Sequence, residues 1–479
     1  MEIRLSDSFT YKKLIRYVLP CITMMIMTSI YSIVDGYFVS NIIGKNPFAA
    51  VNLVMPVLMA ISAIGFMIGT GGSALTSYYM GLGEKKKANE VFSMLVWLII
   101  ISSCIVAVIG FVFMPQIVEL LGASDTIRSD AILYGRILIL SEPFFMLQNS
   151  FQSFLTTAEK QNLGLLVSVL AGITNMVLDF LLMFVFRLGI AGAAAATVCG
   201  QIIGSVVPLI YFATNTTGSL KLTKAKFDWK CIWKACGNGS SEMLTNLSTS
   251  LVSVVYNLQL MKLANENGIA AYGVIMYVSF IFMAIFFGYA IGVTPIIGYN
   301  YGAGNKKQLH SLLKKSLVIT AVTAITMTVL SEVLALPIAR IFVGYDDTLC
   351  RMTQTGMMLF SISFLFCGFN VFGSGFFTGL GNGLVSATIS FLRTLVIQLA
   401  AVLMLPMVFG INGIWCAVAV AEAVTLVITI TFLIKDNHLM KDTVICISDY
   451  EMTRTHKVYK ALEDMCYEFD LAKPVWLKK

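Results

Sequence analysis

Long runs of apolar residues alternate with short polar segments along most of the chain. About twelve runs are long enough to cross a bilayer, which takes about 20 mostly apolar residues per helix. They lack the regular alternation of a membrane β-barrel strand, and backbone groups inside a bilayer need internal partners, so the runs favour α-helices. The expected crossings are residues 14–40, 49–79, 91–115, 131–158, 163–186, 189–214, 238–261, 270–300, 312–339, 352–380, 384–409 and 412–434. The pattern predicts an all-α polytopic membrane protein with twelve transmembrane helices.

The composition agrees with this prediction and excludes a soluble globular enzyme. Of the 479 residues, 57% are hydrophobic and 12% are charged, whereas a soluble protein carries about 25% charged residues. Polar residues dominate a tail that begins near Lys435. We expect an amphipathic helix around His456 to Phe469 in this tail.

Lysine and arginine concentrate at the two ends of the chain and in every second loop. Cytoplasmic loops of membrane proteins carry such an excess. The basic loops and the N-terminal segment hold Arg4, Lys12, Lys13, Lys85, Lys86, Lys87, Lys221, Lys224, Lys226, Lys230, Lys234, Lys306, Lys307, Lys314 and Lys315. We therefore expect a multi-pass membrane protein with both termini in the cytoplasm. The net charge of +7 reflects this topology and indicates no nucleic-acid surface.

The two halves of the chain match each other at a shift of 221 residues. Gly71, Tyr78, Gly81, Gly83, Lys85 and Lys86 fall on Gly292, Tyr299, Gly302, Gly304, Lys306 and Lys307. Each half holds six crossings, an even number, so the two repeats enter the membrane in the same direction and are related by a twofold axis along the membrane normal. Parallel repeats of this kind occur in secondary transporters, whose substrate sites lie between the halves.

The repeat predicts two six-helix lobes joined by a polar linker. The expected parts are an N-terminal lobe at 1–214, a cytoplasmic linker at 215–237, a C-terminal lobe at 238–434 and a polar cytoplasmic tail at 435–479.

Several motifs of the first half resemble the MATE multidrug and toxic-compound extrusion family. They are Val34-Asp-Gly-Tyr-Phe-Val39, the pair Ala49-Ala50, and the Gly69-Thr-Gly-Gly and Tyr78-Tyr-Met-Gly-Leu-Gly83 segments that end the second crossing. The resemblance covers about residues 10 to 435 and is closest to the bacterial branch of multidrug pumps driven by Na⁺ or H⁺. It implies a secondary active antiporter that exports organic cations or drugs across the cytoplasmic membrane.

Ionisable residues inside the expected crossings are the main site candidates, because a charge at mid-membrane costs about 2.5 to 3.5 kcal/mol on insertion scales. Asp35 and Asp179 are both expected in the outer half of the membrane. Asn175 precedes Asp179 by one helical turn and lies on the same face of the helix. Thr197 lies at a similar depth on the next helix. These oxygen-bearing groups suit a proton or a dehydrated Na⁺. The second half has Tyr256 in place of Asp35, so we expect ion coupling in the first half.

The resemblance assigns cation or proton coupling to the same residues. It implies roles for Asp35, Asn175, Asp179 and Thr197, and it places Gln152 where relatives carry Asn. A Na⁺ ion at Asp35, Asn175 and Asp179 is the only metal that the sequence suggests, and no cofactor is expected.

A second set of residues is expected to line the substrate cleft. It comprises Glu142, Gln148, Asn149, Glu242, Tyr256 and Arg393. Glu142 precedes Pro143, where it would either meet an organic cation or pair with Arg136. Arg393 is expected to pair with Glu242, which lies at a similar depth.

The sequence has no phosphate-binding Gly-x-x-x-x-Gly-Lys-Ser/Thr loop and no His-Glu-x-x-His zinc motif. We therefore expect neither an enzyme nor an ATP-driven pump. A monomer without an obligatory protein partner, acting on a small organic cation in the lipid bilayer, is the favoured reading. The alternative within transport is a lipid-linked oligosaccharide flippase, whose anionic cargo would need a cleft lined with several arginines. The alternative outside transport is a membrane enzyme or receptor that works through its tail, which holds no recognisable catalytic set.

Overall fold

The computed structural model describes residues 3–215, 218–442, 467–470 and 475–478, and nearly all of them are helical. The elements are α1 (Tyr11–Phe38), the π-helical η1 (Val39–Ile43), α2 (Lys45–Gly81), α3 (Lys85–Leu120), α4 (Asp125–Thr157), α5 (Gln161–Asp179), the π-helical η2 (Phe180–Val185), α6 (Gly189–Thr214), α7 (Trp229–Gly302), α8 (Lys306–Val343), α9 (Asp347–Ser361), α10 (Phe364–Gly379), α11 (Gly383–Phe391), the π-helical η3 (Leu392–Ile397), α12 (Gln398–Phe409), α13 (Ile411–Asp442), β1 (Tyr467–Asp470) and β2 (Val475–Lys478).

These helices make twelve segments of membrane-crossing length, as the apolar pattern predicts. Within the described residues, nine helices are long and apolar enough to span a bilayer, and the pair α9 and α10, bent by 45°, makes a tenth span. The two remaining segments are α4 and the first half of α7, which carry more polar residues. Asn265 divides α7 into two crossings, because its backbone (φ 53°, ψ −145°) is not helical.

The internal repeat recurs in the ends of the helices. α2 ends at Gly81 and the second half of α7 ends at Gly302, while α3 and α8 begin at Lys85 and Lys306. Both turns contain a glycine in the left-handed region, at φ 79° in Gly83 and 66° in Gly304. The same local structure therefore forms twice, at the shift found in the sequence.

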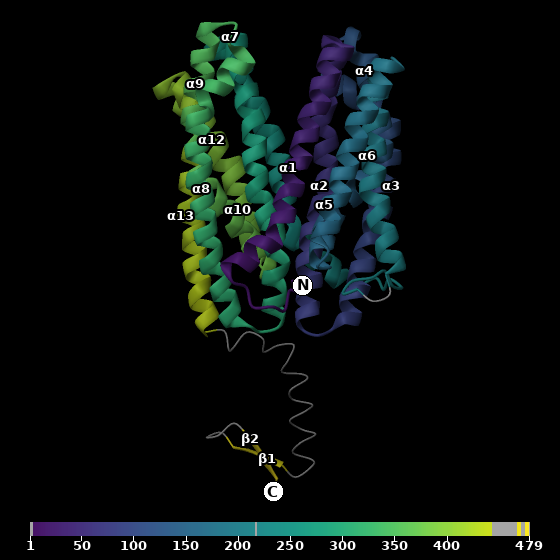
Figure 1. Ribbon diagram of the computed structural model, residues 1–479, viewed down its shortest axis with the longest axis vertical. Helices are drawn as coiled ribbons and strands as arrows, with labels where there is room; N and C mark the ends of the chain where they lie inside the picture. Colours follow the sequence, from purple (N-terminus) through teal and green to yellow (C-terminus); the bar gives the residue numbers. More distant parts are fainter. Residues whose placement is uncertain (1–2, 216–217, 443–466, 471–474, 479) are drawn as a thin grey trace. The chain divides into compact units, whose positions relative to one another are not determined.

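Residues up to Thr429 form one compact unit that contains two six-helix lobes (Figure 1). We call α1–α6 the N-lobe and α7 to Thr429 of α13 the C-lobe. Each lobe has its own apolar core. The N-lobe core includes Val54 and Tyr134, and the C-lobe core includes Tyr256 and Trp415. The prediction of an all-α fold with two six-helix lobes is confirmed.

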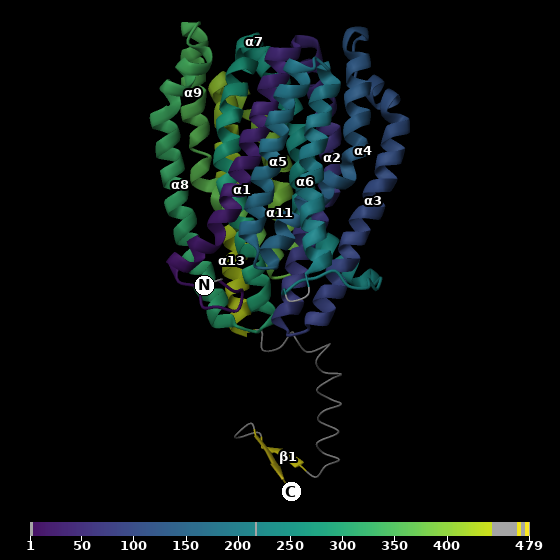
Figure 2. The ribbon, with the colours of Figure 1, turned by 45° about the vertical axis from the view of Figure 1, so that its right-hand side comes forward.

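The lobes meet mainly through α2, which packs along α7, and through α1, which also contacts α7. In Figure 1 and Figure 2, α1 begins at the lower end of the unit, and the turns α2–α3 and α7–α8 lie at the same end. This end carries Lys12, Lys85 and Lys306 and is called the basic end below.

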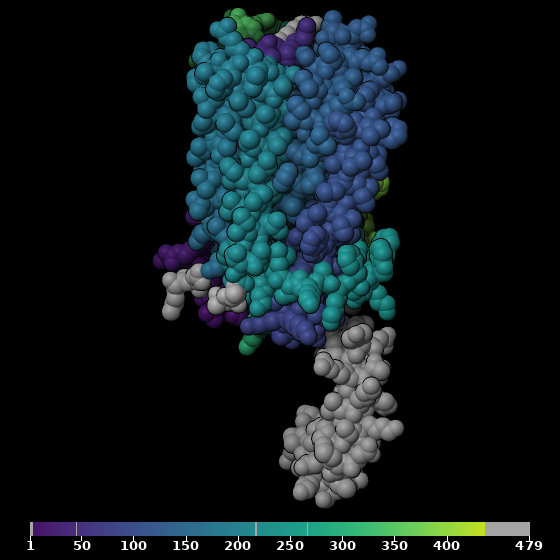
Figure 3. Space-filling view, turned by 90° about the vertical axis from the view of Figure 1, so that its right-hand side faces the viewer, coloured from purple at the N-terminus to yellow at the C-terminus, as the bar shows by residue number. Residues whose placement is uncertain are grey.

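Figure 3 shows the outer face of the N-lobe, where helices of this lobe such as α3 form most of the surface. On α3, exposed side chains such as Ile101, Val108 and Val112 are apolar, with 46%, 63% and 57% of their surface accessible. A face of this kind suits contact with lipid chains.

The tail differs from its predicted form. Tyr467–Asp470 and Val475–Lys478 pair as an antiparallel hairpin, with Tyr467 opposite Lys478. The helix expected around residues 456–469 is therefore wrong for residues 467–469, and residues 456–466 lie outside the described part of the chain. A helix cannot offer the open backbone edge on which strand pairing depends.

Candidate functional site

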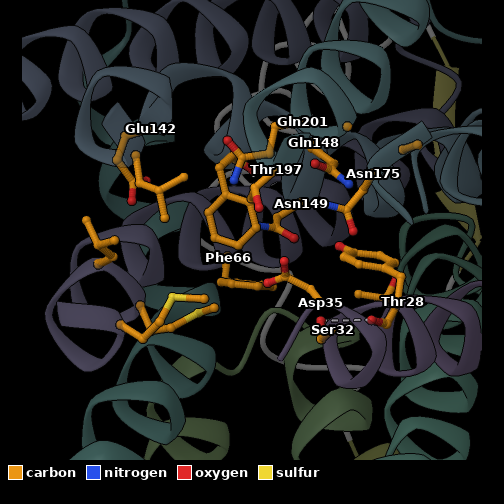
Figure 4. A pocket seen from close by; sticks show the side chains of 18 residues that line it. Thr28, Ser32, Asp35, Phe66, Glu142, Gln148, Asn149, Asn175, Thr197 and Gln201 are labelled. Carbon is orange, nitrogen blue, oxygen red and sulfur yellow. Dashed lines mark hydrogen bonds between the residues drawn. The ribbon is translucent and has the colours of Figure 1, made fainter. Parts of the chain in front are cut away.

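A cavity of about 200 Å³ lies inside the N-lobe, between α1, α2, α4, α5 and α6 (Figure 4). Its polar lining comprises Thr28, Tyr31, Ser32, Asp35, Glu142, Gln148, Asn149, Asn175, Thr197 and Gln201. Its apolar lining includes Met55, Leu58, Met59, Phe66, Leu138 and Phe145. All lining residues come from one lobe, whereas the internal repeat predicts a cleft between the two halves.

Two helices bring their aspartates to this region next to irregular turns. Asp35 lies in the last turn of α1 before η1, and Asp179 is the last residue of α5 before η2. A π-helical turn changes the direction of the side chains around it and often occurs at functional sites. Both acids therefore lie where the helix is already distorted from ideal geometry.

The carboxyl groups of Asp35 and Asp179 lie close enough to influence each other electrostatically. Asp179 is completely buried. Two ionised carboxylates offer only acceptors to each other, so this proximity calls for a proton on one of them or a cation near both. The geometry of the pair thus demands a positive species.

Oxygen atoms around this pair lack protein partners. Asp35 Oδ1, Asn175 Oδ1 and both carboxylate oxygens of Asp179 are buried without a hydrogen bond within the described residues. Buried polar atoms are normally satisfied, so four such acceptors together indicate a site for a proton or for an ion that binds oxygen. Within the described chain, no group of three or more His, Cys, Asp or Glu residues converges to hold a metal ion.

Thr197 and Gln152 have different positions relative to this cavity. Thr197 lines the cavity, and its hydroxyl donates to the Ala193 carbonyl at 3.1 Å, which leaves its lone pairs available. Gln152 is buried on α4, about one turn after Gln148, and is not among the residues that line the cavity. The structure therefore brings Asp35, Asn175 and Thr197 to one cavity, with Asp179 close to Asp35.

The residues expected in the substrate cleft divide between the lobes. Glu142, Gln148 and Asn149 line the N-lobe cavity, whereas Glu242, Tyr256 and Arg393 belong to the C-lobe and do not. Tyr256 is in the C-lobe core, where its ring stacks on Tyr272 with centroids 5.0 Å apart.

Arg393 does not pair with Glu242 but with Glu422 of α13, at 2.7 Å between Nε and Oε1. Asn370 donates from Nδ2 to Glu422 Oε2 at 2.7 Å, and Thr429 donates to Asn370 Oδ1 at 2.7 Å. The expected pair is wrong because similar depth does not determine which neighbouring helix a side chain faces. Arg393 lies in η3 and faces α13.

Glu142 does not pair with Arg136 either. Arg136 donates from Nε to the Phe111 carbonyl at 3.4 Å, and its guanidinium lies 5.0 Å from the centre of the Phe111 ring. A separation of six residues turns the side chain by about 240° around a helix of 3.6 residues per turn. Arg136 and Glu142 therefore point away from each other.

Three hydroxyl groups near the cavity are missing from the sequence-based candidates. Tyr134 lies near both aspartates, and its buried hydroxyl has no hydrogen-bond partner among the described residues. Tyr31 lines the cavity beside Asp35, and Ser62 contacts Glu142. A hydroxyl inside an apolar run was the only available signal, and many such groups simply bond to their own helix.

Comparison with known proteins places this geometry in a family. The MatE family model matches residues 20–181 and 243–404, once in each lobe and over more than half of the chain. The multidrug export protein MepA of Staphylococcus haemolyticus (strain JCSC1435) is 28% identical over 429 residues, which cover 87% of this chain and 92% of that protein. MepA of Staphylococcus aureus (strain MRSA252) is 26% identical over 442 residues, covering 89% and 94%.

Solved structures agree on the fold. The outward-facing conformation of a multidrug resistance MATE family transporter superposes with a TM-score of 0.86 at 21% identity, covering 91% of this chain and 98% of that one. The bent conformation of a MATE protein superposes with a TM-score of 0.83 at 22% identity, covering 92% and 98%. One family model matches the chain twice, once in each six-helix lobe. The chain therefore belongs to the MatE family of membrane transporters.

Proposed function

We propose that this protein is a secondary active antiporter that exports organic cations or drugs across the bacterial cytoplasmic membrane in exchange for Na⁺ or H⁺. The observation that carries the proposal is the proximity of Asp35 and Asp179 beside the N-lobe cavity. An uncompensated pair of buried carboxylates is costly in a membrane interior, so a proton or a cation stabilises the pair.

The coupling ion binds at this pair. A proton would be shared between the two carboxyl groups, and a Na⁺ ion would use the oxygens of Asp35, Asp179 and Asn175 that lack protein partners. When the ion leaves, the two negative charges repel each other across the contact between α1 and α5. Because α1 also packs on α7 of the C-lobe, loss of the ion disturbs the packing between the lobes.

The chemistry of the cavity favours a cationic, largely apolar cargo. Aromatic faces of Phe66 and Phe145 attract cations, and the flexible thioethers of Met55 and Met59 adapt to different shapes. The lining contains acids and no lysine, arginine or histidine. An anionic lipid-linked headgroup would find no positive partner there, so the flippase alternative is less favoured. The staphylococcal relatives, which are named multidrug export proteins, support the same choice.

Orientation completes the proposal. We place the basic end in the cytoplasm, because cytoplasmic loops carry the excess of lysine and arginine, and with it the start of α1. The proposed transporter is a monomer. One polypeptide supplies both lobes, so the proposal needs no second copy of the chain.

Efflux of a fluorescent organic cation from pump-deficient bacteria tests this function. The Na⁺ gradient and the proton gradient are varied separately, and export should follow one of them. Asp35→Asn and Asp179→Asn should each abolish export at unchanged membrane levels, while Asp347→Asn, at an exposed position of α9, should export normally. Full export by both aspartate variants would overturn the coupling mechanism. No export under any gradient, with the protein in the membrane, would favour the flippase.

A further inference from the structure

Glu142 is the second acidic side chain in the wall of the N-lobe cavity, and Figure 4 shows it apart from Asp35 and Asn175. Only 2% of its surface is accessible. We propose that Glu142 is the residue that selects cargo by charge, by pairing its carboxylate with the cationic group of the transported molecule. This inference rests on the proposed export function and assigns a role separate from that of the coupling pair.

Within the described part of the chain, no lysine, arginine or histidine lines the cavity beside Glu142. Arg136, the basic residue nearest in sequence, is turned toward Phe111. The Ser62 hydroxyl, which lies 3.0 Å from each of its carboxylate oxygens, is the one hydrogen-bond partner that the described residues give it. A buried carboxylate without a cation is strongly unfavourable, so a cation entering the cavity would find here an ion-pair partner that nothing else occupies.

Ser62 can respond to the charge state of Glu142. Its hydroxyl has one proton but two acceptors within reach, the Glu142 carboxylate and the Leu58 carbonyl at 2.7 Å. When Glu142 is neutral, the hydroxyl can donate to Leu58 while Glu142 donates to Ser62. When Glu142 is ionised beside a bound cation, Ser62 donates to the carboxylate instead. The carboxylate is thus hydrogen-bonded in the state that binds cargo.

A tight seam between α2 and α4 holds this carboxyl in place. A Cβ atom at Gly65 would lie 2.8 Å from Cβ of Met146, and the Ser150 hydroxyl donates to the Gly65 carbonyl at 2.8 Å. On α4, Met146 lies about one turn and Ser150 just over two turns from Glu142, so the helix backbone there cannot easily move away. A fixed carboxylate loses little entropy when it binds a cation, which is what charge selection requires.

The space beside Glu142 suits the rest of such a molecule. Met55, Met59, Phe66 and Phe145 line the same cavity, and aromatic faces add cation–π attraction to the ion pair. The competing explanation is that the Glu142–Ser62 contact only joins α2 to α4. Glutamine at position 142 separates the two explanations, because it keeps a hydrogen bond to Ser62 and removes the charge.

Binding to the purified full-length protein in detergent provides the test. The probes are tetraphenylphosphonium, a permanent cation, and Nile red, a neutral dye. Glu142→Gln should weaken binding of the cation by about tenfold or more, as expected for loss of a buried charge pair, and should change binding of the neutral dye by less than about twofold. Glu142→Asp should retain part of the preference for the cation. Glu119→Gln, at an exposed end of α3, serves as the control.

The outcomes distinguish the two proposals. Equal loss of both probes in Glu142→Gln would show a purely structural contact, and unchanged binding of the cation would also overturn the role of Glu142. Neither result argues against the proposed role of Asp35 and Asp179, provided that the wild-type protein exports the cation and Asp35→Asn does not. Failure of the wild-type protein to bind or export any organic cation would instead overturn the proposed function.

Discussion

Gly302, the last residue of α7, packs on the carbonyl oxygen of Tyr78 in α2, and a Cβ atom at this position would collide with that oxygen. The repeat produces the matching contact on the other side, where Gly81 packs on the Tyr299 carbonyl. Backbone thus meets backbone between the two lobes at the basic end. This approach is open only to a residue without a side chain.

We predict that Gly302→Ala and Gly81→Ala reduce export strongly, because the lobes can no longer close at the basic end. The lobes should still fold, since neither glycine belongs to the apolar cores. Gly273→Ala in α7 is a matched control, because nothing lies within 4 Å of a Cβ atom built there. The measurements are cation efflux and the amount of monodisperse protein after detergent extraction. Wild-type export by Gly302→Ala would show that this close approach is dispensable.

The pair Arg393–Glu422 should contribute to stability and little to ion coupling, because neither residue lines the cavity. Removing one partner of a buried ion pair leaves an uncompensated charge and costs about 3–5 kcal/mol. We therefore expect Arg393→Met and Glu422→Gln each to lower the thermal unfolding midpoint in detergent. The double variant should recover most of that loss. A double variant as unstable as the single ones would contradict this explanation.

Glu159, which follows α4 at the basic end, should make the N-terminal segment sensitive to pH. Its Oε1 accepts the Leu5 backbone N–H at 2.7 Å. Burial raises the pKa of Glu159 above its usual value of 4.5, so the folded protein holds this proton more tightly than the unfolded chain does. The stability from Glu159 is therefore present below pH 4.5 and is lost as the pH rises through the raised pKa.

We compare the thermal unfolding temperature of the wild type with that of Glu159→Gln. The difference, wild type minus variant, should decrease as the pH is raised from about 4.5 to about 7. Glutamine keeps an acceptor for the Leu5 amide and does not titrate, which makes it the matched control. The difference is read from thermal unfolding in the same detergent at both pH values. A constant difference between the two proteins would show that Glu159 does not titrate differently in the folded and unfolded states.

Deletion of residues 443–479 should leave export unchanged. All residues that line the cavity precede Gly204, and the glycine contacts between the lobes also lie before Thr429. Efflux of the same fluorescent cation, normalised to the amount of protein in the membrane, is the measurement. Loss of export at normal membrane levels would assign the tail a direct role.

Much of the architecture could be predicted from local sequence patterns. The apolar runs end near the observed helix ends, and the polar interruption between residues 261 and 270 contains the break at Asn265. The shift of 221 residues, found from Gly81 and Gly302, coincides with the ends of α2 and α7. These features depend on the chain neighbours of each residue, which the sequence shows directly.

The pairing of side chains between helices could not be predicted in the same way. Depth arithmetic groups Asp35, Asn175 and Asp179, and these residues do lie in one region of the N-lobe. The same arithmetic groups Arg393 with Glu242, although Arg393 pairs with Glu422. Depth is one coordinate, whereas a contact also depends on the rotation of each helix about its axis.

The sequence by itself determined the twelve crossings, the duplicated lobes and the set of charges inside the membrane, because hydrophobic length and repeat spacing are read directly from the order of residues along the chain. Tertiary structure decided that the cavity lies within the N-lobe, that Ser62 meets Glu142, and that Arg393 faces α13. Those choices depend on helix tilt and rotation, which packing against neighbouring helices sets across the whole bundle.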